Sequence, residues 1–484
     1  MTAARRLAAL VGALLLCRVA SAVFVVFQPG YTDAYYYADV AKRLAAGQGL
    51  TADFVWSFLE ATGPLPVPSH RFWMPLATVL QAAGVKALPF LDAFHAAQAV
   101  EILVACAIPV VAYLAARSLG ASANAGQVAA ALAGLGGAFA PGWVSLDAFA
   151  PAAVTGTAFF LCYRRAAAGD VRFGAAAGLA VGLLFLARAE GALFGLALLA
   201  LVRSPTARRA GLAASAVALL IGLGWLARDL ALGAGADLLT RSVLLVRYED
   251  FFASVAPAAP SLGELLAAKP AALLTNAITF AFAFGLLLLP GMARAARRSL
   301  PEVRAFAGLL VLVYLVESLA FTLHSTRGSY FHSLAAFFPF GIALGVVGTG
   351  ELLRSVARAR VAAIGGLAAA LIISVFALMQ WDASFNGPYR ARVAAVAALP
   401  DGTPFLAVDA AAWRWIADRP VIVTPSDREN LTCAAGPYGP IVVVLEPTHF
   451  AAYSAIYDGS HPTAIVGDIR IFPFVPAESA CSRR

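Results

Sequence analysis

The stretch that follows the first apolar segment carries a carboxylate whose surroundings suit proton transfer. Residues 30–47 read GYTDAYYYADVAKRLAAG, with Asp33 near the start and Asp39 farther along. At the mouth of a cavity, Asp33 would be able to take a proton from the hydroxyl of an acceptor molecule. The same spacing suits a helix N-cap, because Thr32 and Asp33 precede a helical stretch. Spacing alone favours the cap and leaves both interpretations open.

A second polar stretch supplies a candidate phosphate ligand. Residues 68–76 read PSHRFWMPL and place Arg71 next to two aromatic side chains. A guanidinium binds phosphate through its bidentate fork. Arginine and tryptophan are also common anchors at the membrane interface. Arg71 is therefore either a phosphate ligand or an interfacial anchor.

A charged turn interrupts a long apolar segment. Residues 186–191 read LARAEG and lie in the middle of the apolar segment 173–202. One helix over that segment would be about 45 Å long, more than a straight span needs. We therefore predict two short helices that meet at a turn within the protein, facing a water-filled cavity. Arg188 would there contact a phosphate and Glu190 a sugar, unless the two form a mutually neutralising structural pair.

Two later clusters add further candidates. In HSTRGSYFH at 324–332, Arg327 and His332 would bind a lipid phosphate, and Tyr330 would contact a sugar or acceptor. The two histidines of this cluster lack an evident third ligand, so we assign no metal site. Tyr248 and Glu249 suit recognition of a sugar or acceptor, or belong to a solvated loop.

The composition shows which elements must position these residues. Hydrophobic residues make up 61% of the 484 residues and charged residues 13%, against about 45–50% and 25% in ordinary globular domains. The apolar residues form repeated blocks long enough to cross about 30 Å of hydrocarbon. The net charge of +8 comes almost entirely from arginines at the ends of these blocks. That pattern marks short cytoplasmic loops and argues against nucleic-acid binding.

The sequence predicts an α-helical polytopic membrane protein with about eleven transmembrane helices. The expected spans are 7–27, 95–116, 125–144, 146–163, 173–187, 190–202, 209–228, 271–291, 303–323, 330–350 and 361–381. The first resembles a signal peptide, but its apolar run continues past the small residues at 20–22, so we expect it to be retained. Basic residues fall on alternate loops, which places the N-terminus in the cytoplasm and the C-terminus outside.

Two domains follow from this path. A transmembrane domain covers 1–381, with outer loops at about 28–94 and 229–270. A small soluble α/β domain covers 382–484. It has β-like runs at 405–408, 420–424, 441–445 and 464–474 and helix-like pieces at 389–399 and 410–418. Cys433 and Cys481 belong to it and would be able to pair in an oxidising compartment.

Several of these features resemble the GT-C superfamily of membrane glycosyltransferases. They are the retained first helix, the acidic Tyr-rich stretch after it, and the Pro-Leu turn at 75–76. The LARAEG turn at 186–191 is similar to the Leu-Thr-Arg-Pro-Glu-Gly-like turn that many of these enzymes carry. The resemblance is closest to bacterial relatives of protein O-mannosyltransferases and to the aminoarabinose transferase of lipid A, and it covers essentially the whole chain.

The resemblance implies transfer of a sugar from a polyprenyl-phosphate carrier to an acceptor outside the cytoplasmic membrane. Asp33 matches the catalytic acid of the family, and Asp147 matches a second acid near the carrier phosphate. Arg71 falls where a cation precedes the Pro-Leu turn. Relatives often have two adjacent acids after the first helix, whereas Ala34 follows Asp33 here, so Asp39 or Asp147 would have to complete a pair. This departure weakens the case for a required metal; a divalent cation is possible, without an assigned site.

Three functions are compatible with these features. The first is an inverting glycosyltransferase with Asp33 as base, whose acceptor is a protein, a lipid or an envelope glycan. The second is a lipid or glycolipid transporter, which would be expected to show paired broken helices in both halves. The third is a non-catalytic membrane protein of envelope assembly. The identities of the sugar and acceptor are not encoded in any motif of the sequence.

Overall fold

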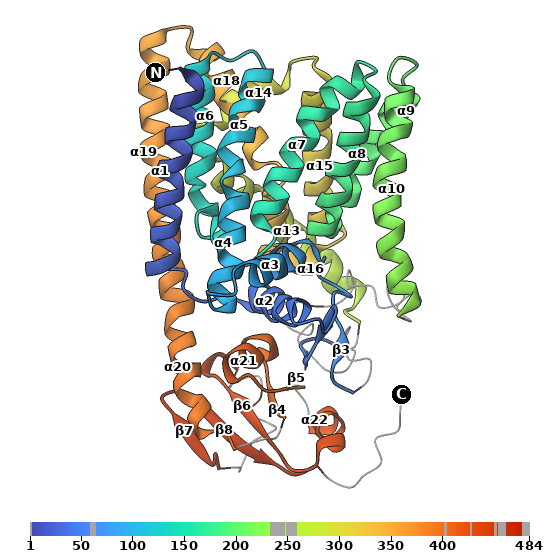
Figure 1. The fold of residues 1–484 in the computed structure, drawn as a ribbon, viewed down its shortest axis with the longest axis vertical. Helices are drawn as coiled ribbons and strands as arrows, with labels where there is room; N and C mark the ends of the chain where they lie inside the picture. The colour runs from blue at the N-terminus through green and yellow to red at the C-terminus, as the bar shows by residue number, and fades with distance from the viewer. Residues whose placement is uncertain are drawn as a thin grey trace.

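The computed structural model describes residues 2–58, 64–232, 247, 259–400, 404–425, 428–449, 453 and 461–476. Figure 1 shows a bundle of long helices with a smaller domain of sheet and helix below it, at the end where the chain finishes. Short elements of the first outer loop lie between the two parts. This intermediate layer is where the bundle, the loop and the C-terminal domain meet.

The bundle consists of helices that follow the predicted spans. They are α1 (Ala3–Phe24), α4 (Ala93–Ala105), α5 (Ala107–Ser118), α6 (Ala123–Leu135), α7 (Phe149–Ala167), α8 (Val171–Ala187), α9 (Gly195–Arg203), α10 (Arg208–Ala231), α13 (Leu262–Phe284), α14 (Leu289–Ala296), α15 (Pro301–Leu319), α16 (Thr322–His324), α17 (Tyr330–Leu334), α18 (Phe338–Leu353) and α19 (Val356–Trp381). Among the described residues, five helices are long and apolar enough to cross a membrane. A sixth is added if the pair Pro301–Leu319 and Thr322–Leu334, bent by 84°, counts as one span. The predicted count of eleven stays a prediction.

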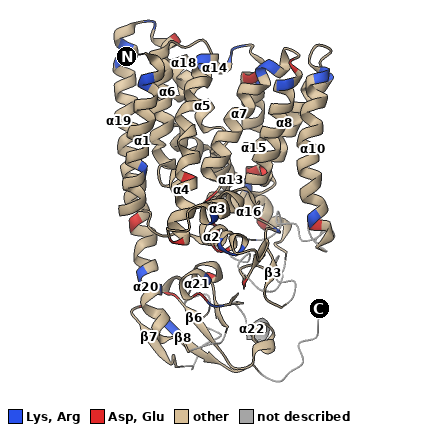
Figure 2. Cartoon of the chain, in the orientation of Figure 1, with Lys and Arg blue, Asp and Glu red and all other residues tan. Residues whose placement is uncertain are grey.

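The outer surface of the bundle is apolar where it would meet lipid. Leu220 on α10 is 75% exposed and Ile372 on α19 is 68% exposed. Figure 2 shows Lys and Arg gathered mainly at the end of the bundle opposite the C-terminal domain. Positive charge of this kind is typical of the cytoplasmic ends of membrane helices.

Small residues bring α8, which leads into the charged turn, close to α10. A Cβ added at Gly174 would lie 2.3 Å from the carbonyl oxygen of Ala210, and one at Gly178 would lie 2.1 Å from that of Ala214. Glycines four positions apart are typical of tight helix pairs in membranes. The contact fixes α8 against α10 and so fixes the turn at the end of α8.

The intermediate layer belongs to the first outer loop. It contains α2 (Thr32–Ala45), α3 (Leu76–Ala87), and the short antiparallel pair β1 (Thr51–Ala52) and β3 (Val67–Pro68). Tyr35, Tyr36 and Tyr37 of α2 are all at most 1% exposed. Their burial shows that the aromatic residues of this loop form a packed layer, as their abundance suggests.

The C-terminal part contains a six-stranded sheet of order β2-β5-β4-β6-β8-β7. Its strands are β2 (Phe54–Val55), β4 (Phe405–Ala407), β5 (Val421–Val423), β6 (Ile441–Leu445), β7 (Ala464–Val466) and β8 (Ile469–Phe474). Its helices are α20 (Gly387–Ala395), α21 (Ala410–Ala417) and α22 (Arg428–Ala435). Every predicted β-like run contains a strand. Cys433 is disulfide-bonded, and Cys481 lies outside the described residues.

The strand β2 crosses the predicted domain boundary, which stays a prediction. It comes from the first outer loop, yet it pairs in parallel with β5, where Phe54 faces Val421 and Val55 faces Ile422. The division between 1–381 and 382–484 therefore separates two parts that share a sheet. The loop and the C-terminal domain form one structural unit.

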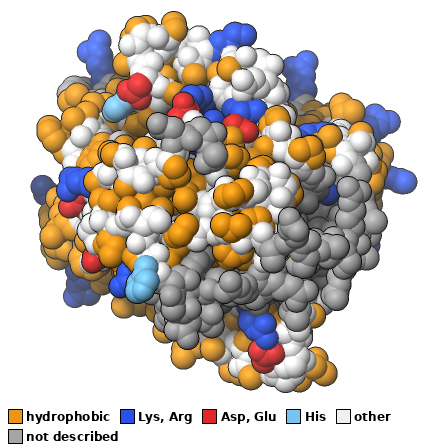
Figure 3. All heavy atoms as spheres, turned by 90° about the horizontal axis from the view of Figure 1, so that it is seen from below, with side chains coloured by type: hydrophobic (Ala, Val, Ile, Leu, Met, Phe, Trp, Pro, Cys, Tyr) orange, Lys and Arg blue, Asp and Glu red, His pale blue; other side chains and the backbone are white. Residues whose placement is uncertain are grey.

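Seen from the end that carries the C-terminal domain (Figure 3), Lys and Arg lie scattered around the rim of the described surface. Hydrophobic and neutral side chains separate them. This described face has no continuous basic surface of the kind that a nucleic-acid backbone needs.

Candidate active site

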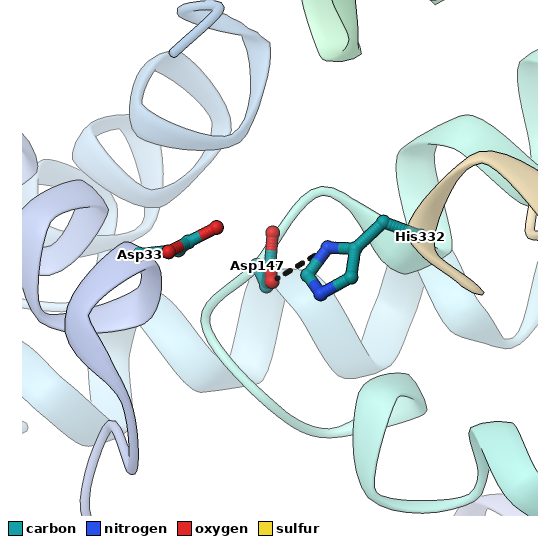
Figure 4. Close-up of side chains that lie close together, drawn as sticks. All are labelled: Asp33, Asp147 and His332. Carbon is teal, nitrogen blue, oxygen red and sulfur yellow. Dashed lines mark ion pairs between the residues drawn. The ribbon is translucent and has the colours of Figure 1, made fainter. Parts of the chain in front are cut away.

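Three side chains from distant parts of the sequence converge where the bundle meets the intermediate layer. They are Asp33 at the start of α2, Asp147 just before α7, and His332 on α17 (Figure 4). Their ligand atoms all lie within 4.8 Å of one another. His332 Nδ1 is 3.5 Å from Asp147 Oδ2, and the Tyr31 hydroxyl donates a 2.6 Å hydrogen bond to the same oxygen.

Asp33 is not the N-cap of its helix. The N-cap of α2 is Tyr31, whose side chain makes no capping hydrogen bond, and Asp33 lies in the first helical turn. Burial raises the pKa of Asp33 to about 8, and the negative charge of Asp147 adds to the rise. The positive charge of Arg188 opposes this rise. A carboxylate with a pKa near neutrality is suited to general base catalysis.

Asp147 is held firmly beside Asp33. Its side chain is buried, and the backbone N–H of Ala148 donates to Asp147 Oδ1. The ring of Phe149, in the first turn of α7, lies 4.2 Å from the ring of His332 between centroids. These contacts fix both the carboxylate and the imidazole, since each is packed against the start of the same helix.

The charged turn has the predicted form of two short helices that meet at a break. The helix α8 ends at Ala187 because Arg188 takes up an extended conformation, with φ −153° and ψ 132°. A short 3-10 segment, η3 (Ala189–Phe194), then leads into α9. Arg188 Nε donates to Glu190 Oε1, so the two are paired as one of the sequence interpretations proposed. Ser333 contacts Glu190 Oε1 at 2.6 Å and directly follows His332, which lies with Asp33 and Asp147. This turn and the acidic stretch therefore lie beside the same cluster.

Glu317 is a further acid of the site, although sequence analysis did not select it. It lies on α15 and is 4% exposed. Its Oε1 accepts hydrogen bonds from Ser329 at 3.2 Å and from Ser333 at 3.1 Å. Ser333 also contacts Glu190 Oε1 at 2.6 Å. The available signal was an ionisable residue inside an apolar span, which is costly and often functional.

The donor set of Asp33, Asp147 and His332 suits a divalent cation. Carboxylate and imidazole groups are ordinary ligands of Mn²⁺ and similar ions. No metal was assigned to His332 from the sequence, because residues 324–332 contain no third ligand. The structure supplies two carboxylates from other segments, so His332 and both acids could hold a cation.

Other predicted residues lie outside this cluster. Asp39, offered as a second acid, instead faces the C-terminal domain, where Arg414 Nη1 is 4.0 Å from Asp39 Oδ1. Asp147 is therefore the acid that accompanies Asp33. Arg71 is buried and interacts electrostatically with Asp229 at the end of α10, where Arg228 Nη2 donates a 2.7 Å hydrogen bond to the Ser69 carbonyl.

The remaining candidates are divided between the bundle and the second outer loop. Arg327 is exposed in the bent segment between α16 and α17. The ring of Tyr330 is buried 5.8 Å from that of Tyr314 between centroids. Tyr248 and Glu249 lie outside the described residues.

Comparison with known proteins gives matches of structure only. No protein-family model and no curated protein sequence matches the chain. The chain is similar to ArnT from Cupriavidus metallidurans bound to undecaprenyl phosphate, with a TM-score of 0.59 and 14% identity over 98% of each chain. It is also similar to AglB, an oligosaccharyltransferase from Archaeoglobus fulgidus, with a TM-score of 0.56 and 14% identity, over 93% of this chain and 71% of that one.

A third similar structure is the arabinofuranosyltransferase AftD from mycobacteria. Its TM-score is 0.53 at 15% identity, over 98% of this chain and 40% of AftD. All three proteins are members of the GT-C superfamily. The chain has the GT-C fold, and the resemblance noted in the sequence is confirmed at that level.

Proposed function

We propose that this protein is an inverting glycosyltransferase that moves a sugar from a polyprenyl-phosphate carrier to a hydroxyl of an extracytoplasmic acceptor. The observation that carries the proposal is the convergence of Asp33, Asp147 and Arg188 where the helical bundle meets the intermediate layer. A base and a positive charge in one place are what glycosyl transfer from a phosphate requires. ArnT binds undecaprenyl phosphate and AglB a dolichol-phosphate in similar folds.

In the proposed reaction, the acceptor oxygen attacks the anomeric carbon of the sugar. A new glycosidic bond forms while the bond from that carbon to the phosphate oxygen breaks. The acceptor proton passes to Asp33, and the polyprenyl phosphate leaves with the electron pair. Arg188 stabilises the charge that develops on the departing phosphate, with Arg71, Arg327 and His332 as further candidates for that role.

The acids next to this centre would orient the reactants. Glu190, whose carboxylate contacts Ser333, would bind the sugar or acceptor. Tyr330 is the second candidate for that role. If only Asp147 and His332 of the three candidate ligands held a divalent cation, the ion would supply additional positive charge near the phosphate, and Asp33 would stay free to receive the proton.

The proposed reaction takes place outside the cytoplasm. The arginine-rich end of the bundle would face the cytoplasm, which places the N-terminus there. The C-terminal domain and the site would then face the periplasm or exterior, in a chain that crosses the cytoplasmic membrane about eleven times, as the basic loops predict.

The test is transfer by purified wild-type protein and by Asp33→Asn. The donors are undecaprenyl-phosphate arabinose, 4-aminoarabinose and mannose, and the acceptors are membranes of a deletion strain of the source organism. We expect wild-type protein to release undecaprenyl phosphate and to label the membranes with one donor, and Asp33→Asn to lose at least about 100-fold in rate. Wild-type rates in the variant would reject Asp33 as the base. Movement of intact donor across a vesicle bilayer without transfer would favour a transporter.

A further inference from the structure

We propose that the C-terminal domain takes part in catalysis by positioning the base. Its residue Asp409 holds Thr32 and thereby sets the orientation of Asp33. The inference rests on the proposed function and makes Thr32 and Asp409 positioning residues. It assigns a role to a domain for which no motif of the sequence indicated one.

The contact between the two parts is made next to the proposed base. Thr32 Oγ1 donates a 3.1 Å hydrogen bond to Asp409 Oδ1. Thr32 is the first residue of α2 and precedes Asp33 directly. Asp409 is the N-cap of α21, where its Oδ1 also accepts from the backbone N–H of Ala412 at 3.4 Å. The first turn of α2 is thus tied to the first turn of a helix of the C-terminal domain.

Asp409 is fixed from its other side by a buried arginine. Arg392 Nη1 lies 3.1 Å from Asp409 Oδ2. The same guanidinium donates to both oxygens of Glu446, from Nε at 3.1 Å and from Nη2 at 3.0 Å. Trp413 Nε1 donates a 3.0 Å hydrogen bond to Glu446 Oε1. Because bidentate charged pairs constrain geometry as well as adding energy, Asp409 has little freedom to turn.

The chain that enters α2 is held by the junction between the bundle and the same domain. The Gln28 side chain accepts 2.7 Å hydrogen bonds from Gly30 N and from the Tyr35 hydroxyl, and it donates to Asn386 Oδ1 at 2.9 Å. Gly30 has φ +98°, and a Cβ there would lie 2.5 Å from the Trp381 ring. The start of α2 is therefore fixed both by the contact of Thr32 with Asp409 and by the contacts of Gln28 and Gly30. Packing of the domain against the bundle would require neither set of contacts.

A second contact between α2 and the domain provides the matched control. Lys42 Nζ lies 3.1 Å from Asp418 Oδ1, with both side chains largely exposed at 46% and 68%. Lys42 is nine residues beyond Asp33, which is about 14 Å along a helix. Both contacts join the same two elements, but only the Thr32 contact adjoins the proposed base. If the contacts only held the domain in place, loss of either one would affect catalysis similarly. If the Thr32 contact positions Asp33, its loss would lower catalysis more.

The test measures kcat and donor KM of Thr32→Val, Thr32→Ser and Lys42→Ala, per amount of folded protein, with the undecaprenyl-phosphate sugar that the wild-type protein accepts. We expect Thr32→Val to lower kcat by about tenfold with donor KM within about twofold, because small displacements of a reacting group are costly to the chemical step. Thr32→Ser, which keeps the hydroxyl, restores most of kcat, and Lys42→Ala leaves both constants unchanged.

A double-variant cycle locates the effect in the contact. Asp409→Ala is expected to lower kcat by a similar factor, and Thr32→Val with Asp409→Ala to be no slower than Asp409→Ala alone. Wild-type kcat in Thr32→Val, equal losses in Thr32→Val and Lys42→Ala, or fully additive losses in the double variant would each overturn the inference. A wild-type protein that transfers no sugar would instead reject the proposed function.

Discussion

Two clusters of charged residues lie close together in this molecule, and they differ in how their charges are combined. Around Asp33, like charges are gathered, because Asp33 and Asp147 lie within 4.8 Å together with His332. Around Arg392, opposite charges are matched, since its guanidinium contacts both Asp409 and Glu446 at about the distance of a direct hydrogen bond. Clustered like charge is typical of functional sites, and matched charge is typical of structural ones.

The contrast separates what each cluster does for the protein. In the Asp33 cluster, burial and the negative charge of Asp147 raise the pKa of Asp33. Such a site lowers the stability of the fold in exchange for reactivity. The Arg392 cluster has the reverse effect, since its charges pair with one another in the interior. We therefore expect variants of the Asp33 cluster to lower activity with little loss of stability. We expect Arg392 variants to lower stability, and the Arg392 cluster to affect activity through Asp409, which holds Thr32.

The largest effect is expected from Arg392→Met, which leaves the buried carboxylate of Glu446 and the half-buried carboxylate of Asp409 without their cation. Removing one partner of a buried ion pair typically costs about 3–5 kcal/mol. The free energy of unfolding in detergent, or the melting temperature, is the measurement. Lys42→Ala is the control, because exposed pairs contribute about 0–1 kcal/mol. A change in Arg392→Met no larger than in Lys42→Ala would remove the distinction between the clusters.

The next effect is on activity and comes from Asp147→Asn. The substitution keeps the size of the side chain but removes a negative charge beside Asp33. We expect at least about 30-fold slower transfer, together with a melting temperature equal to or above that of the wild type. Sugar transfer and thermal unfolding are measured on the same preparation. Slower transfer with a large loss of stability would mean that Asp147 is structural.

The smallest effect concerns pH and a third buried group, His70 in the first outer loop. Burial lowers the pKa of its imidazole from 6.5 to about 3, and the nearby charge of Arg228 acts in the same direction. Its Nδ1 contacts the Trp73 carbonyl at 3.0 Å. Since the unfolded state binds a proton at a higher pH than the folded state, stability is fully present above about pH 6.5.

Stability is then lost as the pH falls from about 6.5 towards 3, with a slope of at most about 1.4 kcal/mol per pH unit from this group. Thermal unfolding in detergent between pH 7 and 5 measures the slope. We expect His70→Gln to unfold at lower temperature at pH 7 but to show a shallower dependence on pH. An unchanged slope in His70→Gln would show that this histidine does not stay neutral in the folded protein.

Local features of the site were predictable from the sequence because local rules control them. The length of 173–202 and its charged centre predicted the break at Arg188, and the structure has α8 ending at Ala187. The acidic stretch predicted a helix beginning near Asp33, which is α2. Hydrophobic blocks with basic ends predicted the bundle. In each case the prediction uses a property of one segment: its hydrophobic periodicity, its length, or the cost of burying its charged residues.

Contacts between distant segments were not predictable in this way. No pattern in the sequence joins His332 to Asp147, and only the packing of α17 against α7 brings them together. The same holds for β2, whose two residues add to a sheet that lies mostly in the last hundred residues. Thr32 and Asp409 are 377 positions apart, so the tie between the base and the C-terminal domain becomes visible only in three dimensions.

The most direct test of the central claim compares two acids of the same helix. Asp33 and Asp39 both lie on α2, but Asp33 joins Asp147 and His332, whereas Asp39 faces Arg414. Single-turnover transfer by Asp33→Asn and Asp39→Asn is measured with the donor that the wild-type protein accepts. We expect loss of transfer in Asp33→Asn with near wild-type transfer in Asp39→Asn. Equal rates in the two variants, or loss in Asp39→Asn alone, would contradict this expectation.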